Sequence, residues 1–423
     1  MPRALRTVAI IVLVTLALDI GLAQVAKRVL PNWHALMPAS NPRQWSPIYH
    51  HGLRPMMQVK SRVETIVYPF NTNSLGMVDA SARRIEPRGT GCRVLAIGDS
   101  FTEGFGVGWD KSFAGILATR WRAQGVDLLN AGVVTYSPTI YYRRMRHLIE
   151  EVGLRVDAVL VFIDMSDISD EWHSYDLDAN DNVVAIGGVA QIPPMREPKW
   201  RDHVWFAIQD NSMIAHLAKD FYGALTRKPR VAAVDLAADS NATARGSTRA
   251  PAARPPVPPP VPHRAPTAPA LGEVAVPPAI GPPPPNPPEF DGMINIGNGR
   301  WTVDPALWNE YGRNGARVAA ERMDRLLLLL RARGVALTVA VYPWPDQIYA
   351  GDRQSAQVRF WGEWARTRGV GFIDLFPPFF QDADRLATIR RYYLKGDFHW
   401  NPAGHALIAD EVDRAYAPRR LCR

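Results

Sequence analysis

The feature that most constrains the fold is an alternation of short apolar segments with longer amphipathic ones. The short segments are rich in β-branched residues and end at polar residues or glycine, which is typical of buried strands. They predict strands at Arg93–Ile97, Val126–Ala131, Asp157–Phe162, Ala336–Tyr342 and Gly371–Leu375. The longer segments predict helices at Lys111–Gln124, Pro138–Val152, Val204–Leu225, Pro305–Arg333, Ala356–Arg368 and Pro402–Tyr416. Parallel neighbours need crossover helices, so we expect an α/β fold with a doubly wound, flavodoxin-like parallel sheet of about five strands.

A proline-rich segment interrupts this pattern. Of the 37 prolines, 17 lie between Pro251 and Pro288, a composition that can neither pair as strands nor continue a helix. Strand and helix signals occur on both sides, so we expect a disordered insertion at 241–289 within one domain formed by 91–240 and 290–423. The segment fits a semi-stiff spacer, and its PxxP spacings leave open a ligand for a proline-binding domain.

The N-terminal 32 residues carry an export signal of some kind. The stretch from Val8 to Ala26 is apolar apart from three polar residues, and basic residues flank it. Its length is close to the roughly 20 residues that cross a bilayer core. Because Ala23–Ala26 offers no good small-residue cleavage site, we favour an uncleaved anchor over a cleaved signal peptide.

Residues 33–90 are rich in turns, and we expect them to wrap the domain as an N-terminal extension. His50 and His51 lie in this part. Neighbours on a strand point to opposite faces, so we interpret them as a surface pair and not as a metal site.

The net charge of +8 and the pI of about 9.6 would suit an anionic partner. The basic residues are scattered, however, and no basic motif with interleaved aromatic residues is present, so we expect no nucleic-acid partner. Nothing in the sequence implies a metal or an organic cofactor.

Polar residues follow the predicted strands at the edge where open α/β sheets bind ligands. The first strand is followed by Gly98-Asp99-Ser100, and serine becomes a nucleophile when a base takes its proton. Near the C-terminus, GDFHWNPAGH places Asp397 two residues before His399. A carboxylate so close can accept a hydrogen bond from Nδ1 and leave Nε2 for the serine.

GDSFTEG, a glycine after the second strand and D-x-H-W-N-P-x-G-H together resemble the SGNH/GDSL hydrolase superfamily, from about Cys92 to the end of the chain apart from the insertion. The resemblance implies Ser100 as nucleophile, His399 as base and Asp397 as the acid that orients it. It also implies that the backbone N–H groups of Ser100 and Gly132 stabilise the oxyanion. The upstream NTNSLG is similar to a stretch of membrane-anchored bacterial members.

Two departures from the family pattern are relevant. Ser166 takes the place of an asparagine that donates to the oxyanion, and we expect its hydroxyl to donate there instead. Asp164 and Asp167 flank it with negative charge that would oppose an oxyanion. The acid precedes His399 by two residues instead of three, and this D-x-H-W form resembles the periplasmic alginate O-acetylation proteins.

The resemblance implies a serine-dependent esterase acting on O-acyl groups of an extracytoplasmic polysaccharide or glycan. The alternatives are a polysaccharide O-acetyltransferase and a non-catalytic glycan-binding or assembly protein. Trp344 and Trp400 are candidates for lining the substrate site. We expect a single-pass inner-membrane protein with its domain in the periplasm, a secreted form being the second choice.

The two cysteines, Cys92 and Cys422, lie at opposite ends of this domain. The first strand starts at Cys92 and runs toward the active-site edge, and the last helix is expected to run back from it. An exported domain would then hold a Cys92–Cys422 disulfide, which would stabilise it by about 2–4 kcal/mol.

Overall fold

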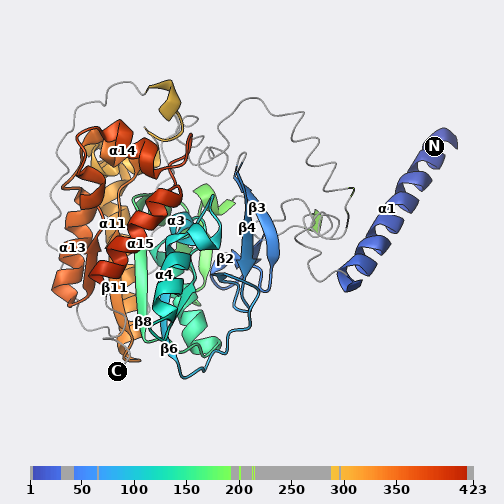
Figure 1. Cartoon of the computed structure of the whole chain (residues 1–423), viewed down its shortest axis with the longest axis horizontal. Helices are drawn as coiled ribbons and strands as arrows, with labels where there is room; N and C mark the ends of the chain where they lie inside the picture. The colour runs from blue at the N-terminus through green and yellow to red at the C-terminus, as the bar shows by residue number, and fades with distance from the viewer. Residues whose placement is uncertain are drawn as a thin grey trace.

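The computed structural model describes residues 3–29, 42–63, 66–191, 200–201, 212, 214, 287–294 and 297–416. In this part of the chain the main sheet has eight strands in the order β12-β11-β8-β6-β7-β5-β4-β3 (Figure 1). The strands from β12 to β7 are parallel: β6 (Cys92–Ile97), β7 (Val126–Asn130), β8 (Ala158–Ile163), β11 (Ala336–Val341) and β12 (Gly371–Asp374). Their order confirms the predicted doubly wound, flavodoxin-like sheet.

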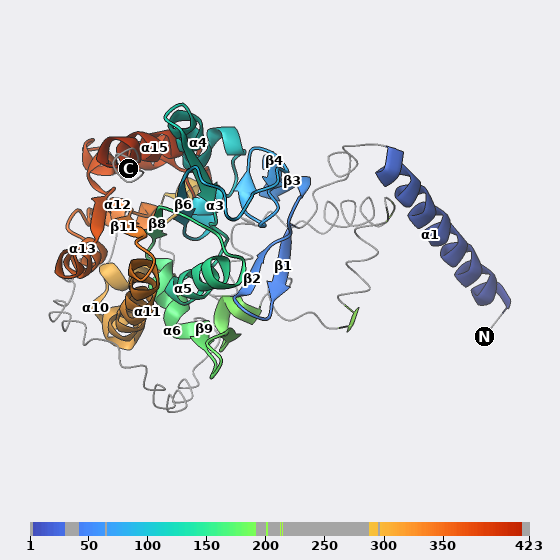
Figure 2. The same cartoon turned by 90° about the horizontal axis from the view of Figure 1, so that it is seen from below.

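Helices cover both faces of this sheet. One face carries α4 (Phe113–Arg122) and α15 (Pro402–Ala415), and the other carries α5 (Pro138–Arg146), α6 (Ser166–His173) and α11 (Arg313–Arg331) (Figure 2). The edge strand β12 packs against α13 (Ala356–Arg368). The shorter helices are α3 (Ser100–Glu103), α10 (Pro305–Leu307), α12 (Pro345–Ala350) and α14 (Arg385–Tyr392). The helix predicted at Val204–Leu225 lies outside the described residues apart from positions 212 and 214.

Two of the predicted helices, Pro138–Val152 and Pro305–Arg333, contain π-helical turns. The α5 helix continues through a π-helix at His147–Glu151, and a second π-helix at Trp308–Gly312 joins α10 to α11. Hydrophobic periodicity alone cannot distinguish such a turn from a regular helix.

The N-terminal extension adds strands to the sheet. The antiparallel strands β3 (Gln58–Val63), β4 (Ile66–Thr72) and β5 (Val78–Asp79) extend it beyond β7, where Val78 pairs with Asn130. Two hairpins lie outside this sheet: β1 (Arg43–Ser46) with β2 (His50–Leu53), and β9 (Tyr175–Leu177) with β10 (Val183–Ala185). The extension therefore covers what would otherwise be an open edge of the parallel sheet.

The interpretation of His50 and His51 as a surface pair is wrong. Both side chains are buried, and their Nδ1 atoms lie 2.8 Å apart. His50 has a positive φ of 70°, so the backbone leaves extended geometry and the two rings no longer point to opposite faces. Tyr136 and Tyr175 pack against the pair, which is part of the core.

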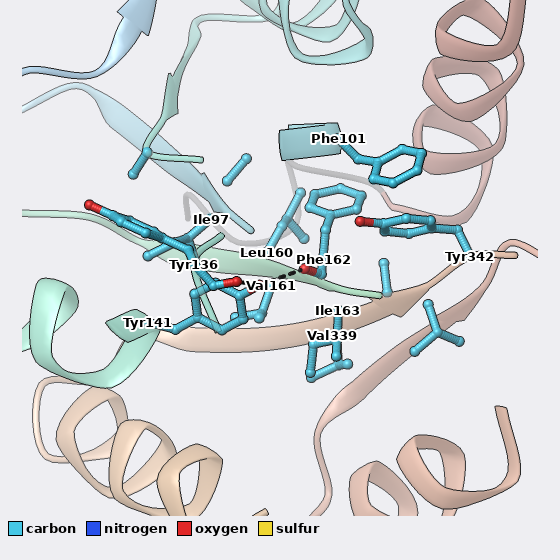
Figure 3. Close-up of a cluster of buried hydrophobic side chains, with 14 of the residues drawn as sticks. Ile97, Phe101, Tyr136, Tyr141, Leu160, Val161, Phe162, Ile163, Val339 and Tyr342 are labelled. Carbon is cyan, nitrogen blue, oxygen red and sulfur yellow. Dashed lines mark hydrogen bonds between the residues drawn. The ribbon is translucent and has the colours of Figure 1, made fainter. Parts of the chain in front are cut away.

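The centre of the core lies between β8 and the helices on either side. All six residues of β8 are buried, as expected of a parallel strand covered on both faces. At the carboxyl ends of the strands, Phe101 packs against Tyr342 with ring centroids 5.0 Å apart (Figure 3). The Tyr141 hydroxyl lies 3.4 Å from the carbonyl oxygen of Phe162 on the other face of the sheet. The residues that follow these strands are thus held by well-packed neighbours.

The N-terminal helix is a candidate membrane span. The helix α1 (Arg3–Val29) includes Leu5–Val25, a 21-residue stretch of mean hydropathy 2.4 that is long and apolar enough to cross a membrane. A signal sequence would meet the same criteria.

The insertion at 241–289 lies outside the described residues except for its last three. Cys92 begins β6 and is not a free thiol, but Cys422 lies outside the described residues, so their pairing stays a prediction.

Candidate active site

A sharp turn at the end of β6 presents Ser100. A Cβ on Gly98 would lie 2.2 Å from Thr102 Oγ1 and 2.9 Å from the carbonyl oxygen of Phe162, so only glycine fits there. Asp99 caps α3, because its Oδ1 accepts a hydrogen bond of 3.0 Å from the Phe101 N–H. The chain therefore turns from strand to helix within two residues and places Ser100 at the first position of α3.

A loop before α15 brings His399 to the same edge of the sheet. Asn401 caps α15 by accepting from the N–H groups of Ala403 and Gly404, and Pro402 occupies the first helical position. An isolated bridge pairs Tyr393 with Trp400 and closes the loop. The N-cap and this bridge fix both ends of the segment that carries Asp397 and His399.

Asp397, His399 and Ser100 form a continuous hydrogen-bonded chain. Asp397 Oδ1 lies 2.6 Å from His399 Nδ1 and also accepts from the His399 N–H at 2.8 Å. His399 Nε2 lies 2.7 Å from Ser100 Oγ. Since the carboxylate must accept from Nδ1–H, Nε2 carries the lone pair and can take the hydroxyl proton. This is the geometry required to activate a serine.

Two of the groups that we expected to bind an oxyanion, Gly132 and Ser166, have other partners in the structure. The Gly132 N–H donates to Asn130 Oδ1 at 3.0 Å, and Ser166 donates its hydroxyl hydrogen to Asp164 Oδ1 at 2.7 Å. Gly132 packs against α3, where a Cβ would lie 2.6 Å from Thr102 Cβ. Use of either donor in a reaction requires it to exchange its present acceptor for the substrate.

The two tryptophans expected to line the substrate site are both buried. Trp400 packs in the core against Phe101 and Tyr342. Trp344 stacks on Phe398 with ring centroids 4.2 Å apart, and its Nε1 donates to Asp164 Oδ2 at 2.9 Å. The aromatic ring next to His399 that is partly exposed is Phe105, at 4.6 Å between centroids. Phe105 directly follows the GDSFTEG stretch, but its sequence position gave no indication of this contact.

Three carboxyl groups meet behind Ser100. Oxygen atoms of Asp99, Asp164 and Asp167 lie within 4.8 Å of one another, and all three residues are buried. Burial, followed by the nearby charge of Asp164, raises the pKa of Asp99 and that of Asp167 well above the usual range of an aspartate. The sequence placed Asp164 and Asp167 near the site, but the raised pKa of Asp167 depends on burial that only the fold reveals.

An ion pair from the N-terminal extension reaches α3. Arg43 Nη2 lies 2.6 Å from Glu103 Oε1, and Glu103 Oε2 accepts from the Val134 N–H at 3.0 Å. Glu103 is buried and lies three residues after Ser100. We did not predict this pair from the sequence. A glutamate three residues after a candidate nucleophile could have indicated a charged side chain close to the site.

Comparison with known proteins finds one matching family model. Residues 306–422 match the family model of an SGNH hydrolase-like domain, acetyltransferase AlgX, and this range includes Asp397 and His399 but not Ser100. No curated protein matches the sequence.

Three similar solved structures have low sequence identity. A lipolytic protein of the G-D-S-L family from Desulfitobacterium hafniense is 10% identical with a TM-score of 0.33, covering 77% of this chain and 99% of that one. A member of the same family from Veillonella parvula is 9% identical with a TM-score of 0.34, covering 77% and 98%. A psychrotrophic esterase from Pseudoalteromonas is 10% identical with a TM-score of 0.32, covering 76% and 95%.

Proposed function

Because this chain carries an SGNH/GDSL hydrolase domain and is an esterase or O-acyltransferase, we propose that Ser100 is its nucleophile, His399 its general base and Asp397 the acid that orients the base. The observation that carries the proposal is the pair of short contacts of His399, 2.6 Å to Asp397 and 2.7 Å to Ser100. Neither contact requires a side chain to move before the reaction begins.

In the proposed first step, Ser100 Oγ attacks the carbonyl carbon of an ester while His399 Nε2 takes the hydroxyl proton. The tetrahedral intermediate collapses to an acyl-serine, and the leaving alcohol takes the proton from His399. A second hydroxyl then repeats the sequence in reverse. Water as acceptor releases the free acid, whereas a sugar hydroxyl forms a new ester.

We propose O-acyl groups of an extracytoplasmic polysaccharide or glycan as the substrate. Support comes from the match of residues 306–422 to an SGNH hydrolase-like acetyltransferase domain and from the D-x-H-W form of residues 397–400. The apolar helix α1 supports an inner-membrane anchor with the domain in the periplasm. Fusion of a periplasm-dependent phosphatase to the C-terminus tests the topology: active fusions support it, and inactive fusions of normal abundance contradict it.

The test of the reaction measures acetate release from an acetylated glycan, with and without an unacetylated glycan as acceptor. The S100A variant is the control for Ser100-dependent chemistry. Release that is independent of acceptor supports the esterase, and transfer of label to the acceptor supports the O-acetyltransferase. A folded wild-type protein that does neither, and that does not react with a fluorophosphonate, supports the non-catalytic glycan-binding alternative. That alternative has one observation in its favour, the commitment of the Ser166 hydroxyl to Asp164.

A further inference from the structure

Asp164 is surrounded by hydrogen-bond donors. Its Oδ1 accepts from the N–H and the hydroxyl of Ser166, at 2.7 Å each, and from the Asp167 N–H at 3.1 Å. Its Oδ2 accepts from Trp344 Nε1 at 2.9 Å. Each carboxylate oxygen has about two acceptor positions. Asp164 is therefore the acceptor of the buried group, with room on Oδ2 for one more hydrogen.

Asp99 supplies that hydrogen. Carboxyl oxygens of Asp99 and Asp164 lie within 4.8 Å of each other. Two carboxyl groups so close can share a hydrogen bond only if one of them carries a proton, and a side-chain hydrogen bond to Asp164 is among the causes that raise the pKa of Asp99. Asp99 Oδ1 already accepts from the Phe101 N–H at 3.0 Å and from the Tyr342 hydroxyl at 3.1 Å. The proton consequently belongs on Asp99 Oδ2, the oxygen that faces Ser100.

A metal ion fits this group less well than a proton. Ca²⁺ takes six to eight oxygen ligands and Mg²⁺ needs octahedral geometry. Most acceptor positions are filled by N–H and O–H donors, which include the Tyr141 hydroxyl at 2.8 Å from Asp167 Oδ2. The oxygens that stay free are too few to replace the hydration shell of such a cation.

We propose that Asp99 is a neutral carboxylic acid that donates its proton to Asp164, and that this neutrality directs the single hydrogen of the Ser100 hydroxyl to His399. The inference rests on the proposed function of Ser100 and deepens it. Ser100 Oγ lies 3.2 Å from Asp99 Oδ2 and 2.7 Å from His399 Nε2, so the two groups compete for one hydrogen.

An ionised Asp99 would affect the reaction in two ways. It would be a strong acceptor for the Ser100 hydroxyl, and its charge would oppose the negative tetrahedral intermediate. A neutral Asp99 whose hydrogen is already donated to Asp164 is a weak acceptor for the Ser100 hydroxyl and carries no charge that would oppose the intermediate. Asp99 is thus a positioning residue that acts through Ser100, and the raised pKa that burial and Asp164 give it agrees with this role.

The first arm of the test is independent of activity. Infrared spectra at neutral pH are compared for the wild type, D99N and the control D291N, which alters an exposed carboxylate. We expect D99N to lose intensity in the protonated-carboxyl band and D291N to retain it. Identical bands in the wild type and D99N would overturn the proposal. This result stands whether or not Ser100 reacts with esters.

The second arm measures the rate of fluorophosphonate labelling of Ser100 against pH. D99N keeps a neutral side chain that can donate to Asp164, so we expect its rate to stay within about tenfold of the wild type, with the acid limb of the profile unmoved. D99A loses the hydrogen bonds, and we expect about a further tenfold loss, again without a shift. If Asp99 were charged, its removal would take a negative charge away from the catalytic groups and move the acid limb of D99N by roughly one pH unit, which would refute the proposal. Absence of labelling in the wild type would instead refute the proposed function.

Discussion

His399 Nε2 lies 2.7 Å from Ser100 Oγ, although the two residues are 299 positions apart in the chain. Ser100 follows the central strand β6, and His399 precedes α15 on the face of the sheet that also carries α4. The contact therefore depends on the whole parallel sheet being formed. Any substitution that shifts β6 relative to α15 should impair the reaction before it unfolds the protein.

The orienting role of Asp397 is tested by D397N. The amide is neutral, and its NH2 group can turn toward His399 Nδ1 in place of the oxygen that now accepts from Nδ1–H, so the histidine is free to adopt the wrong tautomer. We expect the rate of fluorophosphonate labelling to fall by about 10³-fold or more, with an unchanged melting curve. D291N should label at the wild-type rate. A D397N rate within tenfold of the wild type would contradict the assigned role.

The Arg43–Glu103 pair joins the N-terminal extension to α3. R43A leaves a buried carboxylate without this cation, and we expect the free energy of unfolding to fall by about 3 kcal/mol. E103Q removes the charge and can still accept from the Val134 N–H, so the double variant should lose less than the sum of the single losses. Urea denaturation of the four proteins measures this coupling. Additive losses would show that the pair does not stabilise the fold as a unit.

Trp344 contributes a donor to the buried carboxylate of Asp164. W344F keeps most of the ring that stacks on Phe398 but removes the Nε1–H···Oδ2 bond. We expect labelling of Ser100 to slow by about tenfold, because a hydrogen bond to a charged group is worth about 1.5–3 kcal/mol. The matched control is W361F, which alters a buried tryptophan of α13 whose Nε1 has no partner among the described residues. If the two substitutions slowed labelling equally, the slower labelling of W344F would be due to altered packing and not to the lost hydrogen bond to Asp164.

The buried histidine pair predicts acid sensitivity. His51 Nε2 donates to the Val134 carbonyl at 2.9 Å, so His51 Nδ1 must accept from His50 Nδ1–H, and both rings are neutral. Burial lowers the pKa of His50 from 6.5 to about 4, and burial followed by His50 lowers that of His51. The unfolded chain binds protons below pH 6.5 and the folded chain does not, so stability is full above pH 6.5 and falls as the pH drops toward 4.

For His50 alone, this stability loss amounts to at most about 3 kcal/mol between pH 6.5 and 4. Urea denaturation of the wild type and H50Q across this range measures it. We expect the H50Q curve to fall less steeply, since one titrating group is gone. Parallel curves for the two proteins would show that His50 does not titrate differently in the folded and unfolded states.

The elements predicted from sequence are those set by local pattern. The five parallel strands and the helix α13 follow from apolar periodicity, and the strand-to-turn change at Gly98 locates Ser100. The two-residue spacing of Asp397 and His399 likewise suggests their contact before any fold is known. These features depend on residues within a few positions of each other.

The features that sequence did not predict depend on distant segments. The pairing of β5 with β7 joins the extension to the sheet through one residue pair, which has no signature in either segment. The burial of His50 follows from a positive φ that histidine rarely adopts. The hydrogen bonds that Asp164 accepts come from α6 and from the residues following β11. No pattern along the chain specifies them.

The most direct test of the account is the identification of the acylated residue. The protein is mixed with p-nitrophenyl acetate, quenched in acid and digested, and the acetylated peptide is located by mass spectrometry. We predict a burst of nitrophenol with acetate on Ser100, no adduct in S100A, and no burst in H399A. An adduct on another residue, or an undiminished burst in S100A or H399A, would contradict the assignment of Ser100 and His399.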